Sequence, residues 1–93
     1  MLEIYSIIRN KEESQILIIC KLEDDKDLEM IAFIISSICD SHFCIEYTHK
    51  EVLKFFKELT KKEEIFGKFV TFGVGLYQGE VVFFFGKNTT NNQ

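Results

Sequence analysis

Residues 39–49 hold the densest group of side chains in this chain that could do chemistry. Four of them have the side chains that zinc prefers: Cys39, His42, Cys44 and His49. The spacing is poor, because a single residue separates His42 from Cys44 and no C-x2-C or H-x3–5-H pair occurs. The zinc signal is therefore weak. The other interpretation is that both cysteines are small core residues and that His42 caps the end of a helix.

The same stretch could supply a cysteine nucleophile activated by a histidine. Such a pair needs a thiol of lowered pKa, usually at a helix N-terminus. We expect Cys39 near the C-terminal end of a helix, where the dipole disfavours a thiolate, and Cys44 on a strand. The sequence therefore predicts no enzymatic activity and no cofactor. The alternative is a small-ligand or metal-dependent sensor or enzyme that uses residues 39–49.

An acidic run follows the second apolar segment. Five carboxylates fall within seven residues: Glu23, Asp24, Asp25, Asp27 and Glu29. A calcium-binding EF-hand loop would need a glycine at its sixth position, and no glycine precedes Gly67. A helix start uses only one or two such carboxylates for capping. We therefore predict that the run begins a helix and that its carboxylates contact another protein with a basic surface.

Two further patterns predict ordinary structure. Gly73-Val74-Gly75 is a G-x-G, but no helix follows it, as a dinucleotide-binding fingerprint would require. Lysines at 50, 54, 57 and 61 form a stripe without interleaved aromatic side chains, and nearby glutamates dilute its charge. We interpret this stripe as a solvated helix face.

Composition bounds the class of protein. The 93 residues carry a net charge of −4, which argues against nucleic-acid binding, and the length suits one domain. We expect that domain over residues 1–87 and a fraying polar tail over 88–93. An odd count of 3 cysteines and an N-terminus without a basic segment predict a cytoplasmic protein. The longest apolar stretch, 28–39, is too short to cross a membrane.

The stretch from 68 to 87 predicts a β-hairpin. A two-residue loop at Gln78-Gly79 would pair Tyr77 with Glu80. The pairing then continues on one apolar face that must be buried: Leu76 with Val81, Val74 with Phe83, and Phe72 with Phe85. On the other face, glycines lie across from Val82 and Phe84.

A first hairpin is predicted from residues 2–9 and 15–22, joined by a polar loop of four or five residues. Both strands are apolar on both faces over much of their length. At least one of them is therefore expected in the middle of a sheet.

Two helices are predicted between the hairpins. In the first, Asp24 or Asp25 is the N-cap, and apolar residues at helical spacing surround the cylinder broadly enough to require a core or a second subunit. In the second, Thr48 and Glu51 form a capping box, and Val52, Phe55, Phe56 and Leu59 form the buried side. The alternating residues 43–47 predict a short third strand between the helices.

The element order β-β-α-β-α-β-β predicts a two-layer α+β fold, with a mostly antiparallel sheet of four or five strands and both helices on one face. Two short helices should not cover both faces of such a sheet. Either they divide between the faces, or a homodimer buries one sheet face or the first helix, and we favour the homodimer. Size, charge and the weak chemical signals favour a small protein-interaction module. Inhibitors, immunity proteins and anti-defence proteins that block a larger partner are of this kind.

Overall fold

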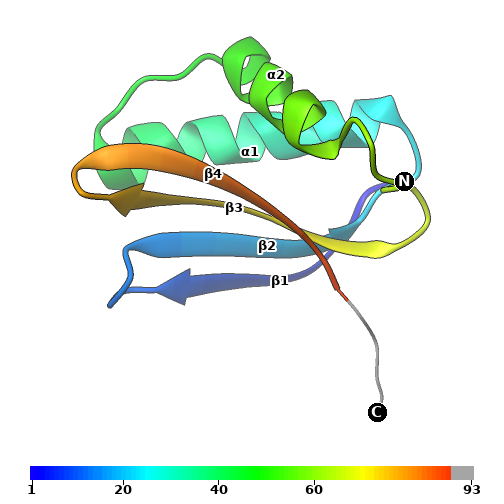
Figure 1. Cartoon of the computed structure of the whole chain (residues 1–93), viewed down its shortest axis with the longest axis horizontal. Helices are drawn as coiled ribbons and strands as arrows, with labels where there is room; N and C mark the ends of the chain where they lie inside the picture. The colour runs from blue at the N-terminus through cyan, green and yellow to red at the C-terminus, as the bar shows by residue number, and fades with distance from the viewer. Residues whose placement is uncertain (89–93) are drawn as a thin grey trace.

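The computed structural model describes residues 1–88, and the expectation of a fraying tail falls mostly on residues 89–93, which lie outside the described part. The elements in chain order are β1 (Glu3–Asn10), β2 (Gln15–Lys21), α1 (Asp25–Phe43), α2 (His49–Thr60), β3 (Phe69–Tyr77) and β4 (Glu80–Lys87). The four strands form one antiparallel sheet in the order β1-β2-β3-β4, and both helices lie on the same side of it (Figure 1). The predicted α+β class is confirmed.

The predicted third strand is wrong. The chain enters a left-handed conformation at Cys44 (φ 55°), and residues 44–48 connect α1 to α2 without joining the sheet. The amide of Ile45 donates to the carbonyl of Cys39, six residues back, so the chain turns away from the helix axis at this point. Residues 43–47 do alternate between half-buried and exposed, because one side of this extended connection packs on the protein. Within residues 1–88, however, no strand lies beside this segment to form hydrogen bonds with it.

The C-terminal hairpin forms as predicted. Tyr77 pairs with Glu80, and the register carries Val74 to Phe83 and Gly73 to Phe84. Gln78 and Gly79 both have positive φ, 52° and 80°, as a two-residue turn that matches the twist of the strands requires.

The first hairpin also forms, with a four-residue loop at 11–14, and β2 is a central strand between β1 and β3. The register of β1 on β2 shifts between Ile4 and Ser6, which marks a β-bulge at Tyr5. Within residues 1–88 neither helix packs on β1, and most of its side chains are exposed on both faces.

The core lies between the helices and the facing side of β2, β3 and β4. Phe56 of α2 is fully buried at its centre, with its ring centroid 4.8 Å from that of Phe72 and 5.8 Å from that of Phe83. The expectation that Phe55 and Leu59 also belong to the buried side is only partly correct, because 44% and 45% of their surfaces stay exposed. Both lie in a groove beside Val81 and Phe83 of the edge strand β4, and no further strand in the described part of the chain covers them.

Candidate functional site

The structure disperses the four residues of the Cys/His group. Cys39 is fully buried in the core, whereas Cys44 is exposed beyond the end of α1. His42 lies beside its neighbour Ser41, whose hydroxyl is 3.0 Å from Nδ1. His49 stacks on Phe33, with ring centroids 3.9 Å apart. Within residues 1–88, no three side chains of the metal-binding types come together as a site.

The buried thiols are also poorly suited to nucleophilic chemistry. Burial raises the pKa of Cys39, and burial together with the negative charge of Asp27 raises the pKa of Cys20 to about 12. Both groups are therefore neutral thiols near pH 7, and the thiolate is the reactive form. These cysteines act as small apolar side chains of the core.

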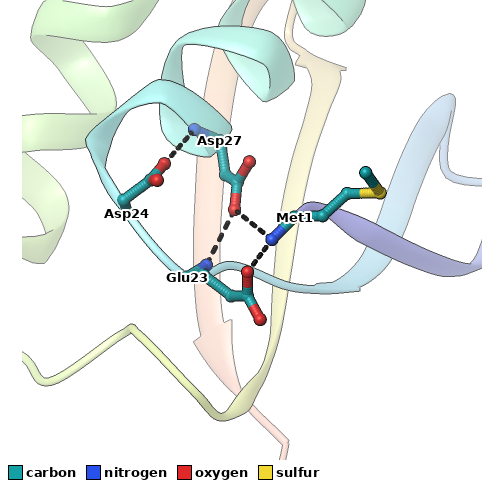
Figure 2. Close-up of polar contacts among 4 residues, drawn as sticks. All are labelled: Met1, Glu23, Asp24 and Asp27. Carbon is teal, nitrogen blue, oxygen red and sulfur yellow. Dashed lines mark hydrogen bonds and ion pairs between the residues drawn. The ribbon is translucent and has the colours of Figure 1, made fainter.

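The acidic run begins α1, as predicted, and two of its members hold that start in place. Asp24 is the N-cap, and its carboxylate accepts the amide of Asp27 at 3.1 Å. Asp27 is buried, and its own carboxylate accepts the amide of Glu23 at 2.8 Å (Figure 2). The ammonium group of Met1 pairs with Glu23 and lies 4.0 Å from Asp27. Asp27 is therefore structural and is not accessible to a partner.

The other two carboxylates of the run point to solvent. Asp25 and Glu29 are exposed, and neither takes part in an ion pair or side-chain hydrogen bond among the residues that the structure describes. They are four residues apart, so they lie on the same face of α1. Glu23 is also exposed, although its carboxylate forms an ion pair with the ammonium group of Met1. Asp27 alone of the five is buried, and exposed Asp24 is engaged in capping the helix, so these three carboxylates are the ones most available to a partner.

Two large apolar side chains share that outer side of α1. Met30 and Phe33 are 52% and 54% exposed, and Phe33 is one turn after Glu29. Both belong to the broad apolar surface of this helix, for which the sequence predicts a core or a second subunit as cover. Neither is covered within residues 1–88, apart from the stacking of His49 on Phe33. Sequence reasoning missed them as site residues. The sequence signal that could have identified them is that Met30 and Phe33 do not lie on the buried side of α1, which carries Leu28 and Ile35.

We refer to this surface as the α1 outer face and define it by Asp25, Glu29, Met30 and Phe33, with Glu23 at its edge. Exposed Lys26, three residues before Glu29, adds one positive charge on the same side. An apolar centre with a polar rim is the usual anatomy of a protein-binding surface. Comparison with family models, with curated proteins and with solved structures found no match for this chain. Neither of the two helices in the described part is long and apolar enough to span a bilayer.

Proposed function

We propose that this protein is a small, non-catalytic, cytoplasmic protein-binding module, of the inhibitor, immunity or anti-defence kind, that covers a site on a larger protein with a basic surface. The observation that carries the proposal is the α1 outer face, where exposed Met30 and Phe33 adjoin the carboxylates of Asp25 and Glu29. The apolar side chains would supply contact area that excludes water. The carboxylates would attract a basic partner and speed the encounter.

Charge reversal on this face tests the proposal. The tagged protein is used to capture partners from its host, and the partner is then measured against wild type and Asp25→Lys/Glu29→Lys at several salt concentrations. These two residues are chosen because Asp24 and Asp27 support the helix start. We expect association about tenfold slower, with a weaker dependence on salt.

The matched control is Glu58→Lys/Glu64→Lys, which changes the net charge equally at exposed positions in α2 and just beyond it. It should leave the association rate near that of wild type. A folded Asp25→Lys/Glu29→Lys variant with an unchanged rate and salt dependence would contradict the assignment. The exposed lysines of α2 would then be the next surface to test.

Metal analysis tests the alternative sensor or enzyme on residues 39–49. Protein purified without chelator should carry no stoichiometric zinc, because Cys39 is buried among core side chains and His49 stacks on Phe33. Near-stoichiometric zinc that disappears in Cys39→Ser would replace the proposal with the alternative.

A further inference from the structure

The face of the sheet opposite the helices is apolar, and no element in residues 1–88 covers it (Figure 1). Alternate residues of each strand reach this face, since successive side chains of a strand point to opposite sides. Its centre carries no charge and includes Ile8, Leu17, Ile19, Val82 and Phe84. We call it the open face.

One end of the open face is hollow. Gly73 and Gly75 lie beneath this end of the face, and the side chains of Leu17, Gln15 and Phe84 occupy the space where their Cβ atoms would be. A depression of about 670 Å³ opens beside Gln15, Val82 and Phe84. Glu12 and Glu13 of the β1–β2 loop form its acidic rim. We call this depression the Gly75 hollow.

The other end of the open face carries a bulky group that includes the ammonium of Lys21, whose cross-strand neighbour on β1 is Glu3. Tyr5, which the β-bulge brings to this side, packs edge-on against Phe69 with ring centroids 4.4 Å apart. The ammonium of Lys21 lies 5.6 Å from the centre of the Phe69 ring. Tyr5 remains 58% exposed despite this packing. We call these three residues the Tyr5 cluster.

The Tyr5 cluster and the Gly75 hollow complement one another in shape and in charge. They lie at opposite ends of the same face, because Phe69 and Gly75 are six residues apart on β3, about 20 Å along an extended strand. A single molecule cannot bring them together. Two copies can do so if their open faces meet across a twofold axis that is parallel to both sheets and perpendicular to the strands. This axis exchanges the two ends of the face, so each Tyr5 cluster lies over the Gly75 hollow of the other copy.

We propose that the open face binds a second copy of this chain. The two sheets pack face to face in a four-layer dimer, helices outside, with each Tyr5 cluster seated in the partner's Gly75 hollow and each Lys21 directed at the acidic rim of Glu12 and Glu13. Such an interface is isologous, since the same two patches meet twice. It leaves the α1 outer face free, and it does not depend on the proposed function.

The contact area that the open face can provide agrees with a reversible dimer. Four strands about 4.8 Å apart and eight residues long cover about 500 Å² in projection, or about 1,000 Å² for two copies. That is near the smallest area of specific interfaces, about 1,000 to 1,200 Å². The dimer should therefore dissociate on dilution.

Sedimentation equilibrium on the full chain tests the proposal, because mass as a function of concentration gives the dissociation constant. Wild type should be a dimer at tens of micromolar. Either Lys21→Glu or Glu12→Lys/Glu13→Lys should weaken the dimer about tenfold or more by placing like charges together. Combining the three substitutions should restore much of the affinity, since the pairs then attract with their signs exchanged. Restoration is not expected from a general loss of folding.

Two controls separate this interface from other surfaces. Glu58→Lys/Glu64→Lys changes the net charge as much as the loop variant does and should leave the dimer intact. Phe33→Lys alters only the α1 outer face and should also leave it intact. A monomeric wild type at 100 µM, a dimer unaffected by both charge variants, or a dimer abolished by Phe33→Lys would each overturn the proposal. A different protein found on the open face of a monomer would do the same.

Discussion

The carbonyl oxygen of Ser14 lies 2.9 Å from the position that a Cβ atom would occupy on Gly75. The same oxygen accepts the amide of Leu76 at 3.1 Å, so it is held in place at the end of the first hairpin. Glycine is therefore required at residue 75 for space and not for an unusual backbone angle. This close approach joins the two hairpins at the hollow end of the open face.

The first prediction follows from that contact. Gly75→Ala should destabilise the protein by about 1 to 3 kcal/mol, because a backbone atom would have to move to admit the methyl group. Gly86→Ala is the control on the same face of the sheet, where a Cβ would meet nothing within 4 Å. It should change stability by less than about 0.5 kcal/mol. Urea unfolding of both variants measures the difference, and equal midpoints would contradict the account.

The second prediction concerns the cysteines. At pH 7.5, N-ethylmaleimide should label Cys44 rapidly, because it is exposed, whereas Cys20 and Cys39 are buried. Their raised pKa values also keep both buried thiols protonated at that pH. Mass spectrometry should therefore find one fast label per native chain and three after unfolding in urea. Cys44→Ser should remove the fast label, and rapid labelling of Cys20 in native protein would show that the core is not closed.

The third prediction uses the capping box at the start of α2. Thr48→Ala should cost about 1 kcal/mol, the typical value for loss of an N-cap hydroxyl. The pKa of Glu51 is lowered, first by the amide and then by the hydroxyl of Thr48, both of which donate to its carboxylate.

This lowered pKa sets the pH dependence. A carboxylate whose pKa is lower in the folded state stabilises the protein above its unfolded pKa, and that contribution is lost as the pH falls through the folded pKa. Wild type should therefore exceed Glu51→Gln in urea midpoint at pH 7, and the two should converge as the carboxylate becomes protonated. A constant difference across this pH range would show that the charge of Glu51 is not responsible.

The fourth prediction separates the two roles within the acidic run. Asp27→Asn removes a buried charge that accepts the Glu23 amide and lies near the terminal ammonium, so it should cost about 1 to 3 kcal/mol. Asp25→Asn, at an exposed position, should change stability by less than about 0.5 kcal/mol. Thermal unfolding at pH 7 measures both, and equal losses would mean that the run acts as a single unit.

Much of the fold could be predicted because its signals are local. The register of the second hairpin followed from a two-residue loop whose residues tolerate positive φ, and both helix starts followed from capping side chains within three residues of the amides they bind. Segment 43–47 was mistaken for a strand because alternation reports only that one side is buried. It does not say whether another strand is within hydrogen-bonding reach.

The candidate sites also divide into features that the sequence determines and features that only the folded structure determines. The sequence by itself determined which residues carry charge or thiols, where the helices begin and that the strands are apolar on two faces. Only the tertiary structure decided that Asp27 is buried while Asp25 is exposed, that His49 stacks on Phe33, and that neither helix packs on β1. These outcomes depend on contacts between residues distant in the chain, and neither residue type nor spacing specifies which distant surfaces will meet.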